Sequence, residues 1–326
     1  MSETATRAYL HGMSDRPAPF LKDLGWRLEA GAFAAYVALF RLLPVDAASD
    51  LGAWLFRRVG PLTSTQRTVR RNLEIAFPEL SEAERERLAA DQWAQTGRTF
   101  AEFGLMDRIV GDPSRVEVVG RERLQAISDE RRPTVFFSGH LANWEVMAAV
   151  IVNAGVTCQV TYRAANNPYV DRLFKKSRAA YGVQLFAPKG GDGSREMLAS
   201  LAKGESVALM NDQKFNGGVE APFFGVACRT APGPTRLAIR AGRVLQPMSV
   251  LRLRKARFRV TVHDPIPIPD TGDRAADIRA GVEAVNAFVE DRVRAAPEQW
   301  FWTHKRWPNA AYEPEPLSVA RRNGPG

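Results

Sequence analysis

The segment of residues 131–150, RRPTVFFSGHLANWEVMAAV, constrains the fold of this 326-residue chain more than any other. Residues 134–137 form a short run of β-branched and aromatic side chains after a proline, which predicts a buried strand. Ser138 and Gly139 break this run, and the residues from 141 onward are apolar enough to form a helix. A buried strand that leads through a short turn into a helix is the repeating unit of α/β folds.

His140 lies at the turn, and Glu145 follows five residues later. On one continuous helix, side chains five residues apart point about 140° apart and do not meet. They can meet if His140 lies in the turn, where Gly139 tolerates unusual backbone angles, and Glu145 lies in the first helical turns. A carboxylate bound to one imidazole nitrogen leaves the other nitrogen free as a general base. The sequence therefore predicts a catalytic pair that activates a substrate hydroxyl, with a purely structural His140 as the alternative.

The residues after 115 alternate between short β-branched runs and helical segments. Strands are expected at residues 116–119, 134–137, 156–162, 183–186, 206–210, 244–253 and 258–263. Asn167 and Pro168 fit the cap and first position of a helix, and the expected last helix covers residues 275–295. This alternation predicts an α/β fold with a mostly parallel sheet flanked by helices.

The N-terminal third reads as helical. Helices are expected at residues 21–43 and 47–59, and Ser81 with Glu84 forms a capping box for a helix that ends near residue 103. The apolar run of residues 30–43 is shorter than the roughly 20 residues that span a bilayer. It fits either a membrane-docking helix or a buried core helix. The expected organisation is a loose segment (1–20), a helical membrane-associated region (21–105), an α/β domain (106–310) and a disordered tail (311–326).

The composition narrows the range of partners. The net charge of +9 suits nucleic acid, an anionic membrane or an acidic protein, so a non-enzymatic basic binding protein is a second hypothesis. The basic residues are spread along the chain without a nucleic-acid-binding signature, so we expect no nucleic-acid partner. Cys158 and Cys228 are far apart, which fits a reducing compartment without disulfides. No Cys, His and acid cluster has metal-ligand spacing, so we expect no metal.

The octapeptide SGHLANWE, residues 138–145, resembles the His-x4-acid block of glycerolipid-type acyltransferases. Its Glu version with a preceding Trp is similar to the lauroyl and myristoyl transferases of lipid A biosynthesis. Further blocks resemble the same family and extend the resemblance over residues 72–307. They are NLEIAFPELSEAERERL (72–88), NDQ (211–213), PFFG (222–225), RTAPG (229–233) and PEQWFWTHKRW (297–307).

This resemblance implies a glycerolipid-acyltransferase-like fold and a reaction. A fatty acyl chain would pass from acyl carrier protein to a hydroxyl of a lipid A precursor, an anionic glycolipid, and form an acyloxyacyl ester. The reaction would take place at the cytoplasmic face of the bacterial inner membrane and would need no cofactor. His140 would be the general base, Glu145 would orient it, and Arg163 would stabilise the thioester oxyanion or a headgroup phosphate. Alternative acceptors are a lysophospholipid, an ornithine lipid or another glycolipid.

Further polar residues follow predicted strands, where the sites of α/β proteins lie. Arg163 and Asn166 come after the strand at 156–162, and Asp212 and Gln213 come after the strand at 206–210. We expect these four side chains to bind substrate, with a surface ion pair as the alternative for Arg163.

Two other groups of residues allow two interpretations each. Arg172, Lys175 and Lys176 share one helical face, which is either a solvated surface or a patch for an acidic carrier protein or anionic lipid. Phe223 and Phe224 fit either an acyl channel or the core. The aromatic and basic block at 297–307 suits a membrane interface.

Overall fold

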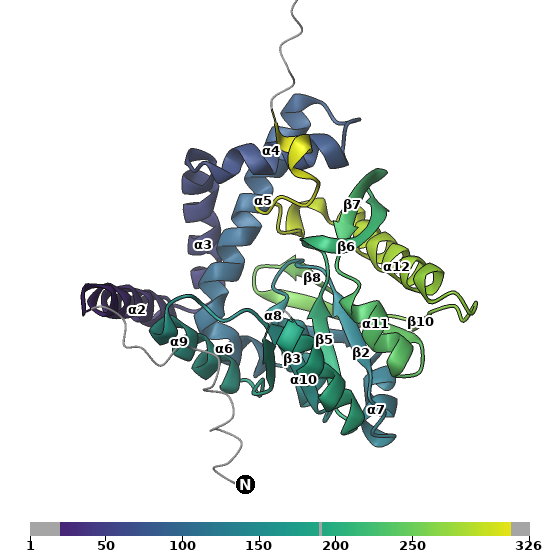
Figure 1. The fold of residues 1–326 in the computed structure, drawn as a ribbon. Coiled ribbons are helices and arrows are strands. Elements are labelled where there is room, and N and C mark those ends of the chain that lie inside the picture. The colour runs from purple at the N-terminus through teal and green to yellow at the C-terminus, as the bar shows by residue number, and fades with distance from the viewer. Residues whose placement is uncertain (1–19, 189–190, 314–326) are drawn as a thin grey trace, which may run out of the picture.

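The computed structural model describes residues 20–188 and 191–313. The expected loose N-terminal segment and nearly all of the expected disordered tail lie outside these residues. The described part consists of an α/β unit and a group of N-terminal helices that lies against one side of it (Figure 1).

The central sheet has the strand order β1-β9-β8-β2-β5-β3-β4, and β10 pairs with β8. Five strand pairs are parallel, and only β8 with β9 and β8 with β10 run antiparallel. This confirms the predicted mostly parallel sheet. The strands are β1 (Val116–Val119), β2 (Val135–Ser138), β3 (Cys158–Tyr162), β4 (Phe186–Pro188), β5 (Ser206–Met210), β8 (Val244–Arg254), β9 (Arg257–Val262) and β10 (Ile266–Pro267).

Helices cover both faces of the sheet, and residues alternate between these faces along each strand. On β2, Phe136 joins the cluster that contains Met147 of α8, whereas Phe137 joins the cluster that contains Leu237 of α11. The helices of this unit are α7 (Arg121–Asp129), α8 (Glu145–Asn153), α9 (Pro168–Ala179), α10 (Gly191–Ala202), α11 (Gly233–Arg240) and α12 (Arg274–Ala295).

The N-terminal helices are α2 (Phe20–Arg41), α3 (Val45–Val59), α4 (Thr65–Ala76), α5 (Glu82–Glu102) and α6 (Met106–Val110). The backbones of α3 and α5 approach closely at Gly52 and Gly97, where a Cβ on either residue would clash with the other backbone. The predicted capping box of Ser81 and Glu84 is present at the start of α5. Within the described residues, no helix is both long and apolar enough to cross a membrane.

The segments 214–230 and 297–307 differ from the sequence predictions, and the strand expected at 183–186 lies instead at Phe186–Pro188. The segment after β5 forms a hairpin of β6 (Lys214–Phe223) and β7 (Val226–Thr230) that the pattern does not predict, because glycines and a proline interrupt its alternation. The predicted membrane interface at 297–307 is wrong, since its tryptophans are 0–1% exposed and form a core cluster. Phe223 and Phe224 belong to that same cluster, so the core interpretation holds for both.

Candidate functional site

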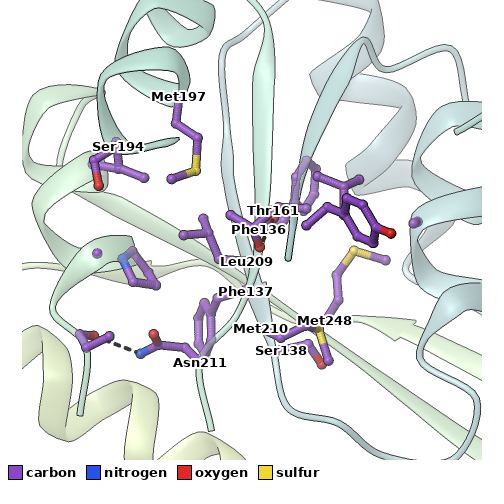
Figure 2. A pocket seen from close by; sticks show the side chains of 18 of the residues that line it. Phe136, Phe137, Ser138, Thr161, Ser194, Met197, Leu209, Met210, Asn211 and Met248 are labelled. Carbon is purple, nitrogen blue, oxygen red and sulfur yellow. Dashed lines mark hydrogen bonds between the residues drawn. The ribbon is translucent and has the colours of Figure 1, made fainter. Parts of the chain in front are cut away.

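A cavity of about 750 Å³ opens at the carboxyl ends of the central strands. The last residues of β2, β3 and β5, which are Ser138, Tyr162 and Met210, all line it. Its walls come from both faces of the sheet, as Figure 2 shows for Met197 on one side of the strands and Met248 on the other. Ligands of open α/β sheets bind in this position, at the carboxyl edge.

The turn after β2 delivers His140 to this cavity. Its backbone is held by the C-terminal segment, because the carbonyl of His140 accepts a 3.0 Å hydrogen bond from the Phe301 amide and the Ala142 amide donates to the carbonyl of Gln299 at 2.7 Å. Ala142 has a φ of 45°, which is uncommon for a residue with a side chain. Helix α8 starts only at Glu145, so His140 lies in the turn, as the sequence predicts.

His140 is bound by Asp212 rather than by Glu145. The Nδ1 atom of His140 lies 2.6 Å from Oδ1 of Asp212, and the backbone amide of His140 donates a 2.6 Å hydrogen bond to Oδ2. The indole of Trp300 donates to the same Oδ2 at 2.7 Å. The Asp212 side chain is fully buried and that of His140 is 17% exposed.

These contacts favour the ionised form of the Asp212 carboxyl. Burial favours a neutral carboxyl, but the His140 ring and the hydrogen bonds outweigh this effect and hold the pKa of Asp212 well below its usual range. An ionised carboxylate only accepts hydrogen bonds, so Nδ1 of His140 carries the proton. The other ring nitrogen, Nε2, has no hydrogen-bond partner in the described part of the chain and has a lone pair that can accept a proton.

The predicted contact between Glu145 and His140 is wrong. Glu145 accepts hydrogen bonds from the guanidinium of Arg178, at 2.9 Å and 2.5 Å, and from the hydroxyl of Tyr181 at 2.7 Å. Burial raises the pKa of Glu145, but Arg178 and Tyr181 more than offset this and lower it overall, with a smaller contribution from the nearby His140. Glu145 therefore acts on His140 only through space, and its direct role is to hold Arg178 in the cavity wall.

The structure separates the other predicted substrate-binding residues. Arg163 and Gln213 line the cavity together with His140. Asn166 is exposed and is not among the lining residues. The neighbouring Asn167 instead caps α9 and donates hydrogen bonds to Trp26 and Glu29 of α2.

Of the basic residues of α9, the predicted patch of Arg172, Lys175 and Lys176 lies outside the cavity. Lys175 pairs with Asp171 at 2.9 Å, and the guanidinium of Arg172 lies 4.6 Å from the ring centre of Tyr169. Because α9 packs against α2, these residues and the exposed Lys176 belong to the surface next to the N-terminal helices (Figure 1).

A buried ion pair contacts the turn that carries His140. Glu102 of α5 and Arg252 of β8 are 0% and 2% exposed and bind each other. Glu102 also accepts a 2.9 Å hydrogen bond from the side-chain amide of Asn143, three residues after His140. The ion pair thus links the N-terminal helices, the sheet and the turn that carries His140.

Three residues of the site are not predicted from the sequence, namely Trp300, Arg178 and Tyr181. Each is brought to the site by tertiary packing, and the only sequence signal was the resemblance of the block that contains Trp300. No group of three or more potential metal ligands occurs within residues 20–188 and 191–313.

The sequence is similar to those of known bacterial proteins. A family model described as bacterial lipid A biosynthesis acyltransferase matches residues 27–309. A lipid A biosynthesis acyltransferase of Haemophilus influenzae is 25% identical over 293 residues, which cover 87% of this chain and 88% of the relative. The lipid A biosynthesis palmitoleoyltransferase of Escherichia coli is 26% identical over 276 residues (81% and 86%), and the E. coli lauroyltransferase is 27% identical over 248 residues (73% and 78%). Because the family model spans most of the sequence, the chain belongs to the bacterial lipid A biosynthesis acyltransferase family.

Proposed function

We propose that the protein transfers a fatty acyl chain from acyl carrier protein to a hydroxyl of a lipid A precursor, with His140 as general base. The observation that carries this proposal is the 2.6 Å contact between Nδ1 of His140 and the buried Asp212 at the edge of a large cavity. Family membership supports the reaction class, and the names of the relatives support the acceptor.

The reaction follows from these positions. Nε2 of His140 takes the proton of the acceptor hydroxyl while the hydroxyl oxygen attacks the thioester carbonyl. The tetrahedral intermediate then collapses, the carbon–sulfur bond breaks, and the imidazolium returns its proton to the thiolate. Asp212 stabilises the imidazolium through the Nδ1 hydrogen bond, and Arg163, which lines the same cavity, stabilises the oxyanion. The thioester supplies the driving force, so the reaction needs no cofactor.

The cavity offers room for the acyl chain on the α8 face of the sheet. Apart from the paired Glu145 and Arg178, its lining there is mostly apolar, and a buried methylene is worth about 0.8 kcal/mol. The lining side chains on this face include Phe136, Met147, Ile151, Val160 and Met248.

We further propose that the protein docks on the cytoplasmic face of the inner membrane through α2 and α3. Large apolar side chains are exposed on these helices, including Leu28 (67%), Leu39 (60%) and Trp54 (54%). The guanidinium of Arg58 lies over the Trp54 ring, a pairing of aromatic and basic groups that suits an interface with anionic headgroups. Arg172, Lys175 and Lys176 of α9 adjoin this surface and would contact the same headgroups.

The direct test is acyl transfer by the purified protein. Acyl carrier protein thioesters and a lipid A precursor are incubated with the protein, and the products are identified by mass spectrometry. We expect an added acyl group in an acyloxyacyl linkage, and loss of this product with folded His140→Ala protein. Transfer to a lysophospholipid but not to the lipid A precursor would overturn the acceptor, and full activity of His140→Ala would overturn the mechanism.

A further inference from the structure

The cavity is strongly electropositive. Five arginines line it, and Glu145 is the one carboxylate among its described lining residues. That carboxylate is already bonded to Arg178. The side chains of the remaining four arginines make no ion pair or hydrogen bond with the described residues, so their positive charge is not compensated within the described part of the protein. They are Arg163, Arg236, Arg240 and Arg274.

Three of these arginines gather at one rim. Arg236 and Arg240 are one turn apart on α11, and Arg274 is the first residue of α12, which packs against α11. All three are exposed. Like charges one helical turn apart repel each other, so an anionic ligand that binds both Arg236 and Arg240 relieves this repulsion. Guanidinium groups bind phosphate oxygens in a bidentate manner, which makes phosphate the anion that fits best.

The position of Arg236, Arg240 and Arg274 indicates which substrate carries the phosphate. Helix α11 and the start of α12 lie on the opposite side of the molecule from α2, which carries exposed leucines (Figure 1). A lipid acceptor held in a membrane under α2 approaches from the α2 side, whereas the thioester donor is water-soluble and reaches the other side. The cavity that these arginines line is also lined by apolar groups such as Met197, Leu209 and Leu237, which suit a slender, mostly uncharged arm. Figure 2 shows Met197 and Leu209 among the side chains of this lining.

We propose that Arg236, Arg240 and Arg274 bind the phosphate of the donor's phosphopantetheine arm and so direct the thioester toward His140. This inference rests on the proposed acyl transfer from a thioester donor. Acyl carrier protein and coenzyme A both carry this phosphopantetheine phosphate, so either could be the donor that the arginines bind.

The test compares three thioesters of one fatty acid, carried by acyl carrier protein, coenzyme A and pantetheine, which lacks the phosphate. We expect the triple variant Arg236→Gln, Arg240→Gln, Arg274→Gln to lower kcat/KM about tenfold for the two phosphate-bearing donors, since exposed charge contacts are individually modest. With the pantetheine thioester its rate stays within about twofold of wild type. The loss shrinks at high salt, because exposed charges are screened. The wild-type ratio of kcat/KM for the first two donors tells which of them is preferred.

A matched control removes three exposed arginines elsewhere. Arg67, Arg121 and Arg254 are exposed, make no ion pair with the described residues and do not line the cavity. Their triple Gln variant changes the net charge by the same amount and should keep wild-type kinetics with all donors. An equal loss with the pantetheine thioester, a loss with the carrier protein thioester alone, or a raised KM for the lipid acceptor alone would overturn the phosphate assignment.

A binding experiment separates this inference from the proposed function. Calorimetry of 4′-phosphopantetheine and of pantetheine with the full chain needs no turnover. We expect wild type to bind the phosphorylated compound more tightly and the triple Arg variant to bind both equally. No preference in the wild-type protein would overturn the phosphate site, whereas a clear preference in a protein that transfers no acyl group would retain the site and overturn the reaction.

Discussion

Asp212 holds His140 at two atoms, with one carboxylate oxygen 2.6 Å from Nδ1 of the ring and the other 2.6 Å from the backbone amide. The two residues are 72 positions apart in the chain. They meet because β2 and β5 are parallel neighbours that end at the same edge of the sheet. This double contact fixes both the orientation of the His140 ring and the conformation of the turn. The pairing of β2 with β5 therefore determines where Nε2 lies.

The buried ion pair between Glu102 and Arg252 should contribute to stability. Arg252→Met leaves the Glu102 carboxylate buried without its partner, and we expect the free energy of unfolding to fall by about 3–5 kcal/mol. Arg259→Met breaks an exposed pair with Glu117 on the neighbouring strands and should cost about 0–1 kcal/mol. Denaturant unfolding of the two variants checks this, and equal losses would contradict the role of burial.

Gly139 should be intolerant of a side chain. A Cβ at this position would lie 3.0 Å from Cγ1 of Val289 and 3.2 Å from Oδ2 of Asp212, so Gly139→Ala shifts the turn and should lower kcat. Gly31→Ala on α2 meets no atom within 4 Å and should stabilise the helix by about 0.5–1 kcal/mol. Melting temperature and kcat are measured on both variants. A folded Gly139→Ala protein with wild-type kcat would show that the turn adapts freely.

The stability of the protein should depend on pH through His304. Burial lowers the pKa of His304 to about 4 from an ordinary value of 6.5. Between these two values the unfolded chain binds the proton and the folded protein does not, so stability falls as pH falls through this window. His304→Gln should reduce the change in the free energy of unfolding with pH. Burial also lowers the pKa of His263 to about 4, so the contribution of His263 to this pH dependence remains. Unfolding free energies at pH 7 and pH 5 test this, and an unchanged pH slope in His304→Gln would contradict it.

Membrane docking should depend on the outer faces of α2 and α3. Replacing Leu28 and Trp54 together by Glu places two charges on the proposed contact surface, and we expect binding to anionic vesicles to fall at least tenfold. Val226→Glu, on the exposed hairpin β6–β7, is the control and should bind like wild type. Flotation with vesicles measures the binding of both variants. Unaltered binding of the double variant would show that these helices do not contact the membrane.

Features set by nearby residues could be predicted from the sequence. The strand and turn around His140, the capping box of Ser81 and Glu84, and the Asn167 cap of α9 are all confirmed. Each depends on side chains within a few positions of one another. The mostly parallel sheet follows from the alternation of these local units, although the order of its strands does not.

The contacts within the site could not be predicted in the same way. Glu145 was the nearest carboxylate to His140 in sequence, but the order of strands brings Asp212 to the imidazole and Arg178 to Glu145. The tryptophans of the C-terminal block likewise resemble an interfacial motif because their composition suits a membrane surface. Their burial depends on packing against α12 and the hairpin, which composition does not reveal.

The most direct test of this account is the single-turnover rate of acyl transfer by Asp212→Asn, compared with His140→Ala and Glu145→Gln. Asn keeps the shape of Asp but removes the charge that stabilises the imidazolium. We expect Asp212→Asn to lose about 10²–10⁴-fold in rate, and the double variant with His140→Ala to be little slower than His140→Ala alone, because the two residues act as a unit. Thermal melting confirms that each variant is folded. A wild-type rate in folded Asp212→Asn, with Glu145→Gln as slow as His140→Ala, would contradict the account and return Glu145 to the role of partner.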